Sequence, residues 1–327
     1  MTENAYGGIS YQGHVTNNTA TIGSGTVNGD VYGGYGTNTG NVTGNIAVIG
    51  GGTVEGYVYG GRSNGSAGLD VSPNRVHIRG GTIMNDVYGA STSNSGVTST
   101  DNSVTINEDN APVRVEGNVY GSSANFSSVT GNHVTIYGGS IQGHVAGGNS
   151  VHGSANTNDV TVNGGSMGSV MGGASYSSGY GSDGNSVTVI SGRVSDVYGG
   201  YSTDGTAGNN IVDIIGGEVY YSVLGGYTNN STAAGNRVSV SGGTIGQMVY
   251  GGMSINGDAT GNSVTISGGT VYGDIYGGYS IARNATGNSV TISGSPNLVH
   301  AILYGGYTGG LIGDAVTGNT LNARSSG

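Results

Sequence analysis

The sequence repeats one short unit along its whole length, and this repetition limits the folds that the chain can adopt. The clearest copy, Gly261–Ser280, reads GNSVTISGGTVYGDIYGGYS, and the next, Gly287–Tyr307, begins with the same GNSVTISG and ends in YGGY. Copies recur every 25 to 31 residues, about 27 on average. Periods of roughly 20–50 residues are typical of solenoids and other repeat arrays. A unit this short cannot bury its own apolar face, so the copies must stack on one another.

Each unit contains three segments with strand character. The first alternates apolar and polar residues, as in Val264, Thr265 and Ile266, which is the period-two pattern of a strand. A Gly-Gly pair such as Gly268–Gly269 follows, where we expect a corner, and the third segment carries Val-Tyr-Gly-Gly, as in Val197–Gly200. Since no segment has the period of a helix, the sequence predicts an all-β chain. We expect a single right-handed parallel β-helix, a β-solenoid of about 12 coils with about 27 residues each.

The repeat boundaries predict one repeat-built domain over residues 1–327. A half-repeat occupies 1–17, full repeats fill 18–318, and a second half-repeat occupies 319–327. The two half-repeats are complementary, and uncapped strand edges tend to pair with other chains. One expectation is therefore a self-assembling extracellular filament whose subunits stack head to tail, with the chain itself as partner. The other is that the chain is a segment of a longer array.

One asparagine opens each copy of the repeat. At an inward-facing corner, stacked asparagine amides can donate and accept hydrogen bonds from coil to coil, which satisfies polar groups that burial would otherwise leave unpaired. We therefore expect a structural asparagine ladder. Its members are Asn18, Asn45, Asn74, Asn102, Asn132, Asn158, Asn185, Asn210, Asn236, Asn262, Asn288 and Asn319.

The composition excludes several classes of function. There is no cysteine among the 327 residues, which excludes a disulfide scaffold, a cysteine nucleophile and a thiolate metal site. There is no lysine, and the formal net charge is −10, so we expect no nucleic-acid partner. No run approaches the roughly 18 apolar residues of a membrane span, so we expect no membrane insertion.

Carboxylates and histidines are the candidates for catalysis. Enzymes that cleave polysaccharides use paired carboxylates, and the tightest acidic cluster is Glu108 and Asp109, with Glu116 nearby. His144 and His152 lie close in sequence but have no evident third ligand, so we expect no metal and no cofactor. We expect no enzyme, and a carbohydrate-active β-helix enzyme is the alternative. Other acids precede Val-Tyr-Gly-Gly or its equivalent in distant copies, and we interpret them as solvent-facing: Asp30, Asp86, Asp196 and Asp274.

Tyrosine supplies the candidate binding residues. If the valine of Val-Tyr-Gly-Gly faces inward, the tyrosine beside it lies on the outer surface. Two interpretations stay open: an aromatic ladder that stabilises coil-to-coil pairing, or an exposed strip that binds sugars or another protein. The column comprises Tyr32, Tyr59, Tyr88, Tyr120, Tyr198, Tyr250, Tyr276 and Tyr304.

The repeat with its GNSVTISGGTVYGDIYGGY pattern resembles the glycine-rich repeats of large bacterial surface proteins, and is most similar to passenger regions of autotransporter-like adhesins. The resemblance covers essentially the whole chain. It implies a secreted or cell-surface location and a non-catalytic structural or adhesive rod, with a surface glycan or protein as partner. The chain as given lacks two features of that family, a signal peptide and a membrane barrel after Asn319.

Overall fold

The computed structural model describes residues 3–65, 68–310 and 314–323. Over these residues the chain forms strands and no helix, and therefore no helix that is long and apolar enough to span a membrane. The chain divides into two compact units, residues 1–168 and 169–327, which are described one at a time. The described strands wind into parallel stacked coils, about 11 turns in all, which confirms the predicted parallel β-helix. The expected boundaries of the half-repeats stay a prediction.

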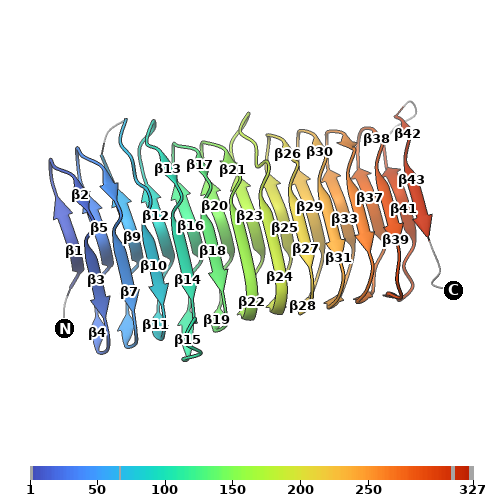
Figure 1. The fold of residues 1–327 in the computed structure, drawn as a ribbon. Coiled ribbons are helices and arrows are strands. Elements are labelled where there is room, and N and C mark those ends of the chain that lie inside the picture. The colour runs from blue at the N-terminus through green and yellow to red at the C-terminus, as the bar shows by residue number, and fades with distance from the viewer. Residues whose placement is uncertain (1–2, 66–67, 311–313, 324–327) are drawn as a thin grey trace. The chain divides into compact units, whose positions relative to one another are not determined.

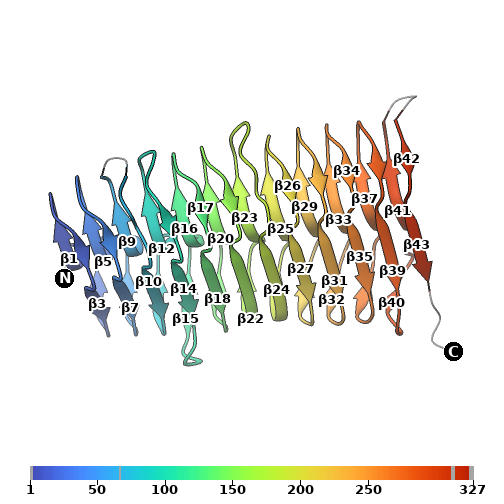
Figure 2. The same cartoon turned by 45° about the horizontal axis from the view of Figure 1, so that its top comes forward.

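Each coil passes through four strand positions, as in β5 (Val31–Gly36), β6 (Val42–Thr43), β7 (Ile46–Ile49) and β8 (Thr53–Val54). Within each unit the long strands lie side by side in one layer (Figure 1). The four-residue strands form a second layer, which is easier to follow in the turned view (Figure 2). Neighbouring coils pair in parallel at equivalent repeat positions, so each position of the repeat becomes a column of side chains.

The remaining strands of the first unit fall into the same four positions. The long strands are β1 (Ala5–Ser10), β9 (Val58–Ser63), β12 (Val87–Thr92), β16 (Val119–Ala124) and β20 (Val145–Ser150). The short strands after the loop are β2 (Val15–Thr16), β13 (Ser99–Thr100), β17 (Val129–Thr130) and β21 (Ala155–Asn156). The third position holds β3 (Thr19–Ile22), β10 (Arg75–Ile78), β14 (Ser103–Ile106), β18 (His133–Ile136) and the longer β22 (Asp159–Met167). The fourth position holds β4 (Thr26–Val27), β11 (Gly81–Ile83), β15 (Val113–Val115) and β19 (Ser140–Ile141).

The second unit repeats the arrangement. Its long strands are β23 (Val170–Ser175), β25 (Val197–Ser202), β29 (Val223–Thr228), β33 (Val249–Ser254), β37 (Ile275–Ser280) and β41 (Leu303–Thr308). The short strands after the loop are β26 (Ala207–Gly208), β30 (Ala233–Ala234), β34 (Ala259–Thr260), β38 (Ala285–Thr286) and β42 (Val316–Thr317). The third position holds the longer β24 (Ser186–Val194), then β27 (Ile211–Ile214), β31 (Arg237–Val240), β35 (Ser263–Ile266), β39 (Ser289–Ile292) and β43 (Thr320–Ala323). The fourth position holds β28 (Glu218–Val219), β32 (Thr244–Ile245), β36 (Thr270–Val271) and β40 (Asn297–Leu298).

The core is made of the β-branched residues that alternate in the third strand and of the first valine of the long strand. Val76 and Ile78 are fully buried, and so is Val87 across from them. Each such side chain contributes about 1.5–3 kcal/mol when it leaves water. The exceptions lie in the terminal coils, where Ile22 and Leu303 are half-buried and Leu321 is exposed. Stacking therefore supplies the apolar contacts that one coil cannot make alone.

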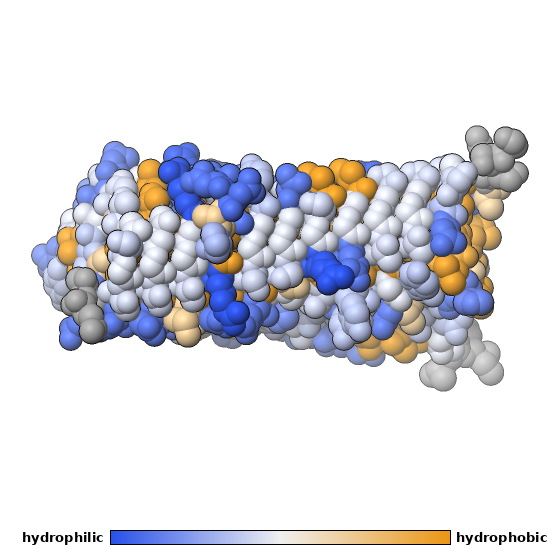
Figure 3. All heavy atoms as spheres, turned by 90° about the horizontal axis from the view of Figure 1, so that it is seen from below, coloured by the Kyte–Doolittle hydropathy of each residue, from blue (hydrophilic) through white to orange (hydrophobic). Residues whose placement is uncertain are grey.

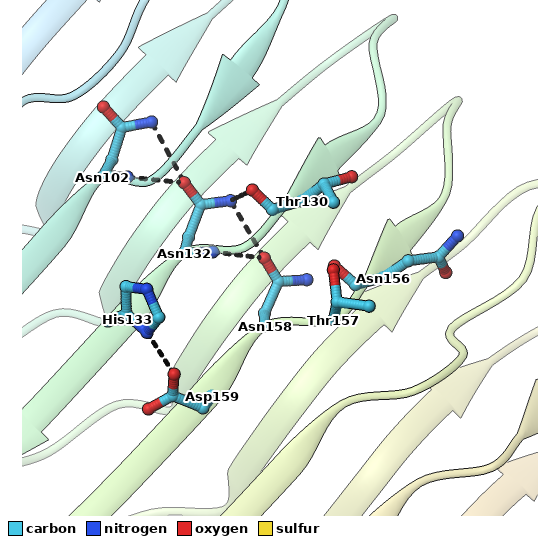
Figure 4. Close-up of polar contacts among 8 residues, drawn as sticks. All are labelled: Asn102, Thr130, Asn132, His133, Asn156, Thr157, Asn158 and Asp159. Atoms are coloured by element: carbon cyan, nitrogen blue, oxygen red, sulfur yellow. Dashed lines mark hydrogen bonds and ion pairs between the residues drawn. The ribbon is translucent and has the colours of Figure 1, made fainter.

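The asparagines that open the repeats form a continuous stack in each unit. Asn132 shows the pattern: its side-chain Nδ2 donates to Asn158 Oδ1 at 2.9 Å, and its backbone N–H donates to the same oxygen at 3.0 Å (Figure 4). Its own Oδ1 accepts both donors of Asn102, at 3.0 and 3.1 Å. The same bonds link Asn18 through Asn158 in the first unit and Asn185 through Asn319 in the second. Asn45 in the first unit and Asn236 in the second are fully buried, so the stack satisfies amides that have no access to water.

The glycine pairs play two different roles. At the corner after the third strand, Gly52 has φ +84°, the left-handed backbone that glycine adopts at little cost. In the long strand, Gly33 and Gly34 both face inward, where a Cβ on Gly33 would lie 2.6 Å from the backbone of Ile46 and one on Gly34 would lie 2.4 Å from Asn45 Cγ. This second pair lets the two layers approach closely and makes room for the asparagine stack.

A methyl group at Gly34 is expected to destabilise the fold. We predict that Gly34→Ala lowers the free energy of unfolding by about 2–3 kcal/mol, because the new Cβ overlaps the buried Asn45 amide and must displace it. The measurement is urea unfolding followed by far-UV circular dichroism. Gly23→Ala is the matched control, since a Cβ there has no atom within 4 Å. Equal stability of the two variants would contradict this packing.

Candidate functional site

In the first unit the predicted tyrosines form one stack of rings on the outer face of the long strands. Ring centroids of Tyr32, Tyr59 and Tyr88 follow one another at 5.0 Å with interplanar angles of 7–8°. Tyr120 continues the stack at 5.4 Å from Tyr88. Tyr32 and Tyr59 are only 5% and 4% exposed. Because each ring face is covered by its neighbours, the column presents ring edges to solvent rather than ring faces.

The second unit contains a shorter stack and one separate tyrosine. Tyr250, Tyr276 and Tyr304 stack with centroid distances of 5.0 and 4.8 Å. Tyr198 lies in the same column, but Leu224 occupies the coil between it and Tyr250. A second column, formed by the tyrosines after the glycine pair, packs against the first, for example Tyr279 edge-on to Tyr276 at 5.1 Å. The structure thus brings the predicted tyrosines of each unit into one column.

The aspartates that precede the long strands bind this column to the backbone. Asp86 Oδ2 accepts the hydroxyl of Tyr88 at 2.7 Å, while its Oδ1 accepts the backbone N–H of Asn118 in the next coil at 2.7 Å. Asp30 makes the same two bonds, with Tyr32 and with the N–H of Tyr57. We interpret these acids as solvent-facing, and all four are partly exposed; the hydrogen bonds of Asp30 and Asp86 add a structural role. The spacing Asp-Val-Tyr is the sequence signal that was available for it.

Burial sets the protonation state of the column. Burial raises the pKa of Tyr88 and Tyr32 well above the ordinary range, and the hydrogen bond to the neighbouring aspartate raises it further. Burial raises the pKa of Tyr198 and of Tyr250 to about 12 in each case, with smaller contributions from Asp196 near Tyr198 and from Tyr279 and Asp274 near Tyr250. These phenols therefore stay neutral near pH 7 and act as packed, hydrogen-bonding groups rather than as nucleophiles or bases.

The candidate acids of the first unit lie in ion pairs with arginines. Arg79 Nε contacts Glu108 at 2.8 Å and Asp109 at 3.8 Å. Glu116 pairs with Arg114 instead. Each carboxylate thus has a cationic partner, an arrangement unlike the acid and base pair of a glycosidase.

The candidate histidines lie on the exposed surface. His144 follows a turn, and the ring of His152 stacks on Phe126 at 5.0 Å. Among the described residues no three histidine or acidic side chains gather into a group that could hold a metal ion.

Two surface grooves lie beside the fourth strand position, one in each unit. The groove of the first unit, about 580 Å³, is lined by the segment Asn110–Arg114, which leads into β15, and also includes Thr82 and Ser140. The groove of the second unit, about 470 Å³, is lined by Tyr220, Tyr221 and Tyr272 together with polar side chains.

Sequence reasoning missed these three tyrosines, because they lie outside the Val-Tyr-Gly-Gly element on which the predicted column was aligned. The available signal was that Tyr220 and Tyr272 directly follow the fourth strand in two different coils.

The raised pKa values of the buried tyrosines predict that the chain unfolds cooperatively, and only at high pH. The phenol of Tyr198 or Tyr250 has a pKa of about 10 in the unfolded chain and about 12 in the folded one. Its contribution to the free energy of unfolding is complete below pH 10 and is lost as the pH rises toward 12. We therefore expect part of the tyrosine absorbance change near 295 nm to appear only above pH 11, together with loss of the β-sheet circular dichroism signal. Ionisation of all tyrosines around pH 10 with the fold intact would contradict the buried column.

Comparisons of this chain with protein-family models, with curated proteins and with solved structures each give no match. The support for a function therefore comes from the geometry of the chain itself, namely its stacked columns, its ion-paired acids and its surface grooves.

Proposed function

We propose that the chain is a non-catalytic structural and adhesive module of a bacterial surface protein, secreted or displayed on the cell surface. The main support for this proposal is that the acidic side chains are engaged in ion pairs and hydrogen bonds. Glu108 and Asp109 pair with Arg79, and Asp30 and Asp86 bind tyrosine hydroxyls and backbone N–H groups. Such acids hold coils together and are poorly placed to share a substrate between them.

The character of the surface also supports a structural role. Seen from the side on which β4 and β15 lie in Figure 1, much of the surface is of intermediate hydropathy, with hydrophilic and hydrophobic residues in scattered patches (Figure 3). Charged residues make up only 8% of the chain. The described residues contain no cysteine, which suits a protein that works in an oxidising environment outside the cytosol.

The repeated columns support the adhesive part of the proposal. Because each repeat position recurs at every coil, a weak contact made by one coil can recur along the column, and several such contacts give avidity. The partner proposed is a surface glycan or protein, as the resemblance to adhesin passengers implies.

This proposal is tested by measuring retention and turnover together. The purified chain is incubated with insoluble polysaccharides and with immobilised extracellular-matrix proteins, and the bound fraction and the release of reducing ends are both measured. We expect retention on at least one surface without new reducing ends, and heat-unfolded chain serves as the control. Release of reducing ends above the blank would show a carbohydrate-active enzyme instead, and retention no greater than that of the unfolded control would remove the adhesive role.

A further inference from the structure

The groove of the second unit is built on one column of the solenoid. Tyr220, Gly246 and Tyr272 each directly follow the fourth strand of their coil, after β28, β32 and β36. The N–H of Gly246 donates to Val219 O at 2.9 Å, and the N–H of Tyr272 donates to Ile245 O at 3.0 Å. The three residues therefore occupy equivalent places in three successive coils, with the glycine between the two tyrosines.

Gly246 keeps a slot open between the tyrosines. A Cβ at this position would lie 2.1 Å from the carbonyl oxygen of Tyr220, so the backbone here excludes every side chain. Coils stack about 4.8 Å apart, which separates the Tyr220 and Tyr272 backbones by about 10 Å. A ring held between two aromatic groups needs about 8 Å, from two contacts of about 4 Å each. The spacing of the two backbones is therefore enough for one six-membered ring.

These tyrosines differ from those of the stacked column in what they expose. Tyr220 is 63% and Tyr272 53% exposed, against 4% for Tyr59. Tyr221 packs edge-to-face on Tyr220 with centroids 4.7 Å apart, which restrains the orientation of the Tyr220 ring before any ligand arrives. Exposed aromatic rings of this kind carry a negative face that attracts the C–H groups of a saturated ring.

Polar side chains lie beside the tyrosines in this groove. Glu218, Thr244 and Gln247 line the same groove, and Glu218 is held by Arg193 at 2.8 Å. Carboxylate, hydroxyl and amide groups together accept and donate hydrogen bonds. A volume of about 470 Å³ is within the usual range of small-molecule sites, roughly 300–1,000 Å³.

We propose that this groove binds one pyranose ring of a neutral glycan between Tyr220 and Tyr272, with Glu218 and Gln247 contacting its hydroxyl groups. A saturated ring with C–H groups on its faces and hydroxyl groups at its rim matches aromatic walls within a polar rim. Anionic ligands are disfavoured by Glu218 and by the net charge of −10. The proposal deepens the adhesive part of the proposed function and rests on it.

The test is a soluble binding measurement on the full chain. Cellobiose, maltose, lactose and N,N′-diacetylchitobiose are titrated by isothermal calorimetry, and saturation-transfer NMR reports which sugar protons contact the protein. We expect at least one disaccharide to bind with its ring protons saturated. Tyr220→Ala and Tyr272→Ala should each weaken binding about tenfold, whereas Tyr220→Phe, which keeps the ring face, should weaken it less.

Tyr180→Ala is the control, since Tyr180 is also an exposed tyrosine of the second unit, at 41%, and does not line the groove. Circular dichroism of each variant establishes that the fold is intact. The site is overturned if no disaccharide binds at 10-fold molar excess over a millimolar protein sample, or if Tyr180→Ala weakens binding as much as Tyr220→Ala. Retention of the wild-type chain on surfaces, unchanged in the groove variants, would leave the adhesive role standing and remove this site alone.

Discussion

The stack of buried asparagines is the interaction on which the rest of each unit depends. Asn45 connects three coils: it donates to Val15 O in the preceding coil and to Asn74 Oδ1 in the following one, and its own Oδ1 accepts from Asn18. A buried amide without these partners would cost about 1–3 kcal/mol for each unsatisfied group. The stack occupies the interior next to the short strands, so the facing long strand has to leave space for it. Gly34 leaves this space because it has no side chain.

Because the asparagine stack and its glycines fill fixed places in the interior, the side chains that vary from coil to coil lie on the outside. With valine, isoleucine, asparagine and glycine fixed by the interior, chemical differences between coils remain at the outward positions and in the loops. The stacked tyrosines use the outer face of the long strands for stability, because their ring faces are covered and their hydroxyls bind aspartates. The groove at Tyr220 and Tyr272 is the opposite case, where a glycine interrupts a column and both tyrosines are more than half exposed.

The repeat period and the alternation of Val264 with Thr265 and Ile266 were enough to predict parallel stacked coils, because in-register stacking is the way in which so short a unit can bury its apolar residues. The sequence did not reveal how the tyrosines pack. Residues three apart in a regular strand face opposite sides, yet the rings of Tyr32 and Tyr35 lie 4.9 Å apart. The reason is that Gly33 and Gly34 both face inward, which breaks the alternation.

The tyrosines of the groove could have been aligned from the sequence. Tyr220, Gly246 and Tyr272 each lie ten residues after the asparagine that opens their coil, namely Asn210, Asn236 and Asn262. The predicted column was aligned on the Val-Tyr-Gly-Gly element and therefore left these residues out. What the sequence does not give is the exposure of Tyr220 and Tyr272 and the packing of Tyr221 on Tyr220, because both depend on tertiary structure.

The most direct test of the central role of the asparagine stack is the stability of Asn236→Ala, measured by denaturant unfolding and by amide hydrogen exchange. Asn236 is fully buried and bonds to Asn262, Asn210 and Ala207 O, whereas Asn297, the control position, is exposed. We predict that Asn236→Ala lowers the free energy of unfolding by about 2–4 kcal/mol, with faster exchange concentrated in the coils that contain Asn210 and Asn262. A loss no larger than that of Asn297→Ala, with unchanged exchange in those coils, would contradict it.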